Sequence, residues 1–223
     1  MSDRLQRIQT RYQNSETANR YDSSRYHDFQ GRWNNRTVWS VLKKALKHVP
    51  AKGRIIDMPC GTGRFSWHLA GEGYQVLASD ISTEMLAVAE KAQPSPNSPR
   101  PVFQKGDLFN LPFKDSEFDA VFCIRFMNLV DRKVRVAAVK EMSRLAPVLI
   151  VSYYHKYTFK YLSRWLRYKL GLRKAPHARL TKEAFLDEIK ETGLHLRELL
   201  PVTPLLSEEW IAVLERSKSS IPK

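Results

Sequence analysis

Short apolar runs alternate with longer segments of helical period along most of the chain. Most runs carry apolar residues on consecutive positions, which is typical of strands covered on both faces of a parallel sheet. The runs predict strands at residues 54–58, 75–79, 102–105, 118–124 and 147–152. Two later runs, near residues 194–199 and 210–215, predict a sixth and a seventh strand.

Between these runs, apolar residues recur at helical spacing. They predict helices at residues 37–49, 65–70, 83–92, 132–145 and 181–192. Pro50 would end the first helix, and Ser82 would cap the third. Strand and helix therefore alternate as in βα units, which predicts the α/β class with helices on both faces of the sheet.

The chain has 223 residues, of which 43% are hydrophobic, enough for one sizeable domain. We place this domain at residues 35–223 and interpret residues 1–34 as an N-terminal helical arm or lid. No apolar stretch approaches the ~20 residues of a membrane span, and the N-terminus does not resemble a secretory signal. With only two cysteines, Cys60 and Cys123, we expect a cytoplasmic protein without disulfides.

The formal net charge is +14 and is unevenly distributed. Residues 1–53 hold 11 basic and 4 acidic side chains, whereas residues 147–180 hold 8 basic and no acidic ones. Charge of one sign on a limited segment favours an anionic partner, such as a nucleic acid, an anionic membrane surface or an anionic substrate. Solubility alone is the alternative interpretation.

Residues 55–66, with the sequence IIDMPCGTGRFS, are the most informative segment. An apolar strand ends on Asp57, a loop with Gly61 and Gly63 follows, and a helical pattern begins near Phe65. In such a unit the backbone N–H groups come close to a ligand, because glycine has no Cβ to block the approach. The segment predicts a nucleotide-type pocket.

Two further acids follow the next strands. Asp80 ends the second strand, where a carboxylate can accept both hydroxyls of a ribose. Asp107 follows the third strand with Leu108 beside it, a pair suited to an adenine amino group and ring face. Because parallel strands end at one edge of a sheet, we expect Asp57, Asp80 and Asp107 to share one crevice.

With these residues in place, the chain resembles the class I S-adenosylmethionine-dependent methyltransferases. The resemblance covers roughly residues 35–216 and rests on four motifs, which read DMPCGTG, ASDIS, GDL and FDAVFCI. It implies a Rossmann-like sheet of seven strands, mostly parallel with the last one antiparallel, and a methyltransferase activity. A nicotinamide dinucleotide is the weaker interpretation, because Ser66 stands where such enzymes usually carry a third glycine.

The resemblance also implies S-adenosyl-L-methionine as the cofactor and gives roles to the motif residues. The first acid would hold its amino group, the second its ribose and the third its adenine. The expected cofactor-binding residues are Asp57, Pro59, Gly61, Gly63, Asp80, Ile81, Met85, Asp107, Leu108, Ile124 and Arg125. Cys60 is interpreted as a small packing residue and not as a nucleophile. We predict no bound metal.

An acceptor of high pKa needs a general base. The candidates for catalysis are His155, which follows the fifth strand, and Tyr154 beside it. Packing in an aromatic patch explains His155 at least as well, and His177 is a further candidate in a basic loop, where a surface role is the more common explanation. The expected substrate-binding residues are Tyr21, Asn128, Tyr153 and Arg164.

Residues 155–180 form a basic helical insert after the fifth strand. Residues 158–170 predict an amphipathic helix that carries Phe159, Leu162, Trp165 and Leu166 on one face. Three interpretations stay open: a lid for a lipid-like acceptor in peripheral contact with an anionic membrane surface, a phosphate-contacting patch for RNA, and a helix packed into the core. Nucleic acid ranks below lipid, because no RNA-binding module accompanies the patch.

The sequence therefore predicts a methyltransferase that acts on a small-molecule or lipid-linked acceptor of anionic character, with oxygen as the preferred target atom and nitrogen or carbon left open. Two alternatives stay open. One is an RNA methyltransferase that uses the basic insert, and the other is a non-catalytic partner subunit that only binds the cofactor.

Overall fold

A seven-stranded sheet organises the protein. The computed structural model describes residues 29–172, 179–203 and 206–216. In sheet order, the strands are β3 (Val102–Lys105), β2 (Gln75–Asp80), β1 (Arg54–Asp57), β4 (Ala120–Cys123), β5 (Val148–Tyr154), β7 (Glu209–Arg216) and β6 (Leu194–Pro201). The first five are parallel to one another, and β7 is antiparallel to both of its neighbours. The predicted seven-stranded sheet with an antiparallel last strand is confirmed.

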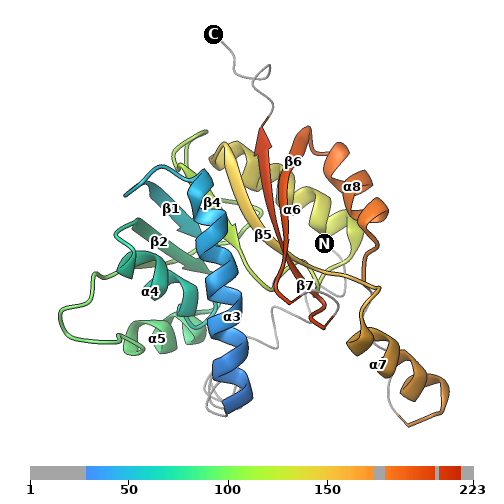
Figure 1. Ribbon diagram of the computed structural model, residues 1–223. Coiled ribbons are helices and arrows are strands. Elements are labelled where there is room, and N and C mark those ends of the chain that lie inside the picture. The colour runs from blue at the N-terminus through green and yellow to red at the C-terminus, as the bar shows by residue number, and fades with distance from the viewer. Residues whose placement is uncertain (1–28, 173–178, 204–205, 217–223) are drawn as a thin grey trace.

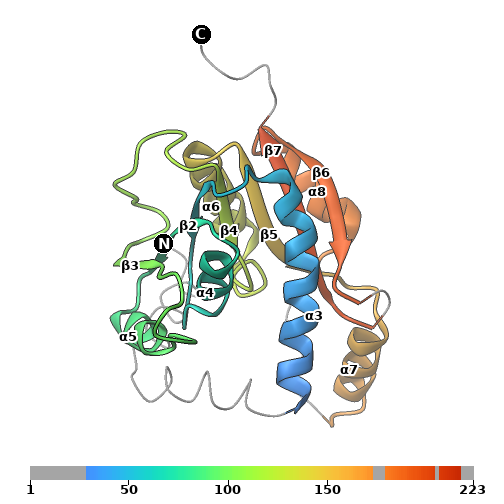
Figure 2. The ribbon, with the colours of Figure 1, turned by 60° about the vertical axis from the view of Figure 1, so that its left-hand side comes forward.

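Helices cover both faces of the sheet (Figures 1 and 2). The helices are α3 (Phe29–Ala45), α4 (Arg64–Gly71), α5 (Thr83–Lys91), α6 (Arg132–Leu145), α7 (Phe159–Lys169) and α8 (Lys182–Lys190), with a 3₁₀ turn at Leu46–His48. One buried cluster joins α3 and α4 to the sheet, and a second joins α6 and α8 to its other face. The central strands are therefore buried on both sides, as their continuous apolar runs predict.

Two helices differ from the prediction by more than one residue at an end. The first helix begins at Phe29, eight residues before the predicted start, and runs across the boundary drawn between residues 34 and 35. Its early residues lack an apolar period, but Asn35 is buried there by a contact to Arg125. Hydrophobic spacing alone places the start of this helix at residue 37. The contact between Asn35 and the distant Arg125 lies in the part of the helix that spacing does not predict. The last predicted helix is shortened to Lys182–Lys190, with Thr181 as its N-cap.

The carboxyl ends of the parallel strands lie together at one end of the molecule. In Figure 1, β7 runs upwards to the C-terminal end of the chain, so the five parallel strands run downwards. The start of α3 and the whole of α7 lie at the same lower end in Figures 1 and 2. The edge where α/β sheets bind their ligands is therefore flanked by these two helices.

The helix α7 confirms the amphipathic helix predicted in the basic insert, with the Thr158 hydroxyl capping it at Tyr161 N–H. Figure 1 shows it extending away from the sheet. Its apolar side chains are exposed to solvent, so the interpretation as a helix packed into the core is wrong. Among the described helices, none combines the length and the apolar character needed to cross a membrane.

A buried ion pair joins α6 to α8. The Arg135 guanidinium donates two hydrogen bonds to Glu188, from Nε at 2.8 Å and from Nη2 at 2.5 Å, and a third to the Val130 carbonyl at 2.7 Å. Both charged side chains are almost fully buried. Each charge lost its contact with water on folding, and the opposite charge now provides the stabilisation that water gave.

We expect Glu188→Ala to lower the free energy of unfolding by about 3–5 kcal/mol, because it leaves the Arg135 guanidinium buried without its counter-ion. Urea unfolding followed by circular dichroism measures this change. The matched control is Glu191→Ala, which breaks the exposed pair with Arg132 and should change stability far less. Equal losses in the two variants would contradict this assignment.

Candidate functional site

The first acid of the predicted site, Asp57, ends β1 and is 2% exposed. The Ser66 hydroxyl, in α4, donates a hydrogen bond of 2.6 Å to its Oδ2. Burial raises the pKa of Asp57 from 3.8 to about 7; the Ser66 hydrogen bond lowers it, and the nearby charge of Asp80 raises it. The carboxyl group therefore stands near the midpoint of its titration at neutral pH.

The second acid, Asp80, ends β2 and is also buried. The Gly61 N–H donates to its Oδ2 at 2.8 Å, and the Ser82 N–H donates to its Oδ1 at 3.0 Å. Burial raises the pKa of Asp80, while these backbone N–H groups lower it. Asp80 thus ties the glycine turn after β1 to the end of β2.

Two buried carboxyl groups in one place are costly, because each loses water and each repels the other when ionised. A ligand that brings positive charge or hydroxyl donors would remove much of this cost. The pair Asp57 and Asp80 therefore favours a cationic or hydroxyl-bearing ligand at this edge of the sheet.

The two glycines of the turn serve different purposes. Gly61 has a φ of +55°, and a Cβ placed on it would meet no atom within 4 Å. A Cβ on Gly63 would lie 2.7 Å from the Ala89 Cβ and 2.9 Å from Phe103 Cε1. Gly63 therefore lets α4 pack closely against α5 and β3, whereas Gly61 leaves open space beside its backbone.

The third acid, Asp107, follows β3. Its neighbour Gly106 donates a backbone hydrogen bond of 3.0 Å to the Asp80 carbonyl, and the Phe109 N–H donates to Asp107 Oδ1 at 3.0 Å. Leu108 is buried. The structure thus brings the ends of β1, β2 and β3, with their three acids, to one edge of the sheet.

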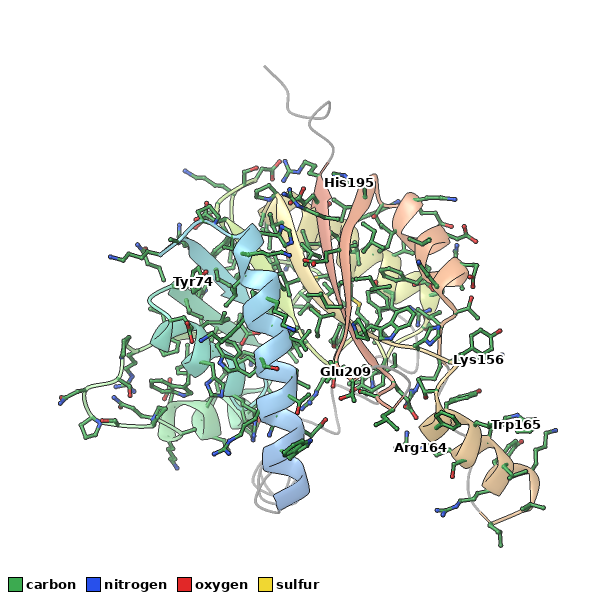
Figure 3. The ribbon with its side chains drawn as sticks, in the orientation of Figure 1. Tyr74, Lys156, Arg164, Trp165, His195 and Glu209 are labelled. Atoms are coloured by element: carbon green, nitrogen blue, oxygen red, sulfur yellow. The ribbon has the colours of Figure 1, made fainter. Side chains whose placement is uncertain are left out.

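Arg125, just past β4, is at the centre of a polar cluster. Its N–H donates to the Ser152 hydroxyl at 2.6 Å, and its guanidinium pairs with Glu209 at 3.2 Å and reaches Asn35 Oδ1 at 3.4 Å. The Arg125 guanidinium also lies 5.9 Å from the centre of the Phe65 ring. Figure 3 shows Glu209 at the lower end of the sheet, the end that carries the acids.

Sequence reasoning missed Asn35 and Glu209, which hold Arg125 in place. An acidic residue at the start of the apolar run 209–216 was the available signal, since such a position is buried and calls for a charged partner. Among the described residues, the Asn35 amide nitrogen and the Asn128 amide oxygen are buried without a hydrogen-bond partner. The Asn35 nitrogen can therefore donate a hydrogen bond to a ligand, and the Asn128 oxygen can accept one from a ligand.

The remaining predicted cofactor residues lie around the same edge. Pro59 follows a cis peptide bond after Met58, and Ile81 is partly buried between β2 and α5. Met85 is buried in the first turn of α5, and Ile124 is buried in the cluster that α3 and α4 share with the sheet.

The catalytic candidates follow or end β5. The His155 ring stacks on Trp210, with 3.8 Å between the ring centres, and burial lowers its pKa below 6.5. His155 is therefore a neutral base near pH 7. The Arg179 guanidinium lies 4.8 Å from the centre of the Tyr154 ring.

Two predicted substrate residues have structural partners elsewhere. Tyr153 is buried against Phe185 of α8, with its hydroxyl in the core. Arg164 of α7 pairs with Glu208 at 3.0 Å, as does Arg179 at 2.8 Å. Two further predicted residues, Tyr21 and His177, lie outside the described residues.

Residues 55–147 match a family model described as a methyltransferase domain. The chain is 36% identical over 118 residues to the putative methyltransferase YqeM of Bacillus subtilis, which covers 52% of this chain and 43% of the relative. It is 38% identical over 92 residues to the demethylmenaquinone methyltransferase of Beutenbergia cavernae, which covers 41% of this chain and 35% of the relative. The chain thus spans less than half the length of these curated relatives.

The fold is also similar to a solved structure along its whole length. That structure is the magnesium protoporphyrin IX methyltransferase of Synechocystis PCC 6803 with bound SAH, at a TM-score of 0.74 and 20% identity. The likeness covers 96% of this chain and 100% of the other.

The raised pKa of Asp57 predicts a pH-dependent stability. The folded protein keeps this proton up to about pH 7, whereas the unfolded chain loses it near pH 4, so ionisation destabilises the fold as the pH rises between these values. In the absence of ligand, the free energy of unfolding of Asp57→Asn should rise relative to that of the wild type as the pH increases. We expect this difference to grow by roughly 2–3 kcal/mol from pH 5 to pH 8.

Urea unfolding of both proteins at the two pH values measures this gain. The exposed Asp187→Asn serves as the control and should show no gain. A stability difference between Asp57→Asn and the wild type that is the same at pH 5 and pH 8 would show that Asp57 titrates normally.

Proposed function

We propose that the chain is a class I S-adenosylmethionine-dependent methyltransferase, which transfers a methyl group from S-adenosylmethionine to a small-molecule or lipid-linked acceptor. We further propose that the target atom is an oxygen and that the protein works in the cytoplasm. Both cysteines are free thiols, which suits a reducing compartment.

The buried acid pair beside an open glycine turn is the observation that carries the proposal. S-adenosylmethionine bears a positive sulfonium, an amino group and two ribose hydroxyls. Asp57 and Asp80 offer the negative charge and the acceptors that these groups need, and the Gly61 backbone faces open space. The residues present therefore fit this cofactor.

Each acid takes the role that its position suggests. Asp80 would accept from the ribose hydroxyls, Asp57 would bind the amino group, and Asp107 with Leu108 would hold the adenine. The other expected contacts are Pro59, Ile81, Met85, Ile124 and Arg125, which lie around the same edge. Gly63 would act indirectly, because its missing side chain serves the packing of α4.

The comparisons support a small acceptor. Relatives and structural neighbours are named for a demethylmenaquinone and for magnesium protoporphyrin IX, which are small molecules and not polymers. The structural neighbour at a TM-score of 0.74 holds SAH, the product of the proposed cofactor.

The cofactor supplies an activated methyl group, and the chain's own residues provide alignment, exclusion of water and removal of a proton. The Arg125 cluster, with Asn35 and Glu209, forms one polar wall of the proposed acceptor site. Asn128 offers an unpaired carbonyl oxygen to a donor group. His155 would take the proton from an acceptor hydroxyl, with Tyr154 beside it to orient the acceptor.

Titration calorimetry with SAH tests the cofactor site. We expect wild-type binding and at least a tenfold loss of affinity in Asp80→Ala, which removes a charged acceptor worth roughly 1.5–3 kcal/mol. Gly61→Ala should weaken binding as well, because its Cβ would enter the open space beside the turn. The exposed Asp187→Ala should bind normally; an absence of binding by the wild type would refute the proposal.

Replacement of His155 tests the proposed base. His155→Phe keeps an aromatic ring on Trp210 but removes the basic nitrogen, so we expect kcat to fall by roughly 100-fold or more while SAH affinity stays unchanged. Turnover is measured as transfer of labelled methyl to a panel of quinols and carboxylate-bearing tetrapyrroles. The wild-type rate should fall in acid as the imidazole protonates, at a lower pH than for an ordinary histidine, because burial lowers the pKa of His155.

The matched control is His195→Phe, at the opposite end of the sheet from Glu209 in Figure 3, which should leave kcat unchanged. Full activity of His155→Phe would instead assign the ring a packing role.

A further inference from the structure

The helix α7 presents an apolar surface to solvent. Five of its large side chains are at least 41% exposed, and they are Phe159, Leu162, Trp165, Leu166 and Tyr168, followed by Leu170 and Leu172 just beyond the helix. Four of these, at positions 159, 162, 165 and 166, share one face at helical spacing. A contiguous exposed patch of this kind in a folded protein marks a surface that meets another apolar phase.

Positive charge surrounds this apolar face. The segment 147–180 holds eight basic and no acidic side chains. Arg164 of the helix pairs with Glu208, which joins the helix to the domain, and Arg179, outside the helix, pairs with the same carboxylate. Arg167 and Lys169 stay exposed on the helix, and the Lys169 ammonium lies 5.7 Å from the centre of the Trp165 ring. The surface therefore combines apolar area with cationic charge.

The patch lies at the functional end of the molecule. Figure 3 shows Trp165 on the part of α7 that extends outwards, and Lys156 and Arg164 where the helix joins the domain. The beginning of α3 reaches the same end in Figures 1 and 2, and it carries a further exposed aromatic residue, Trp33. A flat partner at this end would meet both helices.

We propose that α7 docks the protein on an anionic lipid bilayer, with Phe159, Leu162 and Leu166 buried at the boundary between headgroups and acyl chains. Basic amphipathic helices bind such surfaces through apolar burial together with attraction to anionic lipids. Arg167 and Lys169 contact the lipid phosphates, and Trp165 lies at the interface, where aromatic rings are favoured.

The apolar composition favours lipid over RNA. A single-stranded nucleic acid is bound by basic residues and by aromatic rings on which bases stack. Leu162, Leu166, Leu170 and Leu172 offer no such stacking surface, but they gain free energy in a hydrocarbon phase. The docking is a binding event that does not depend on the proposed methyl transfer, so the two proposals can fail separately.

Co-sedimentation of the full chain with vesicles tests the docking. The vesicles contain phosphatidylcholine alone or phosphatidylcholine with phosphatidylglycerol. We expect binding to the anionic vesicles only. Arg167→Glu with Lys169→Glu should weaken it by at least about tenfold, because each cation near an anionic surface contributes roughly fivefold. Leu162→Ser with Leu166→Ser should weaken it comparably at unchanged charge.

Matched variants serve as controls. Lys114→Glu with Lys140→Glu changes the net charge equally on other exposed positions, and Val102→Ser removes an exposed apolar residue from the edge strand β3. Both should bind anionic vesicles as the wild type does. Circular dichroism and SAH binding, unchanged in every variant, show that the fold is intact.

Three outcomes would overturn the proposal: no binding of the wild type to anionic vesicles, full binding by the two-leucine variant, or equal losses in the control variants. Labelled single-stranded RNA is titrated in parallel. RNA binding that depends on Arg167 and Lys169, without binding to vesicles, would assign the surface to nucleic acid instead.

Discussion

The close burial of Asp57 and Asp80 is the constraint on which the rest of the site depends. Two carboxyl groups at the ends of neighbouring strands share a region from which water is largely excluded, and burial raises the pKa of both. The protein tolerates them through local donors: the Ser66 hydroxyl for one, and the N–H groups of Ser82 and Gly61 for the other. The same donors hold the glycine turn in the form that leaves backbone open to a ligand. A site held in this way is unfavourable when empty and is relieved by a cation, which is the property that suits a sulfonium cofactor.

The sequence predicted those parts of the structure whose causes are local. Strands buried on both faces require consecutive apolar residues, so the central strands were predicted to within a few residues. The predicted bounds of β3 and α6 agree with the observed ones at both ends. The Asp57–Gly61–Gly63 unit is local too, and residues 55–147, which contain it, match a family model described as a methyltransferase domain.

The parts that escaped prediction depend on partners far away in the chain. Arg125 meets Asn35 and Glu209, which are 90 and 84 residues distant, and no spacing rule connects such positions. The start of α3 was missed for the same reason. For α7 the helical period was correct, but periodicity reports only which residues share a face and not what that face meets. Only the fold shows that this face is exposed to solvent. The strand β5 ends at the edge of the sheet, and α7 begins beyond that edge.

The adjacent acids Glu208 and Glu209 have a consequence for how the molecule responds to its surroundings. Glu208 pairs with Arg164 of α7, and Glu209, the first residue of β7, pairs with Arg125 just past β4. Glu208 is the residue before β7, so one dipeptide at the start of this strand holds both α7 and Arg125. A movement of α7 would therefore reach Arg125 through a single peptide unit, which couples the orientation of the helix to the polar cluster that follows β4.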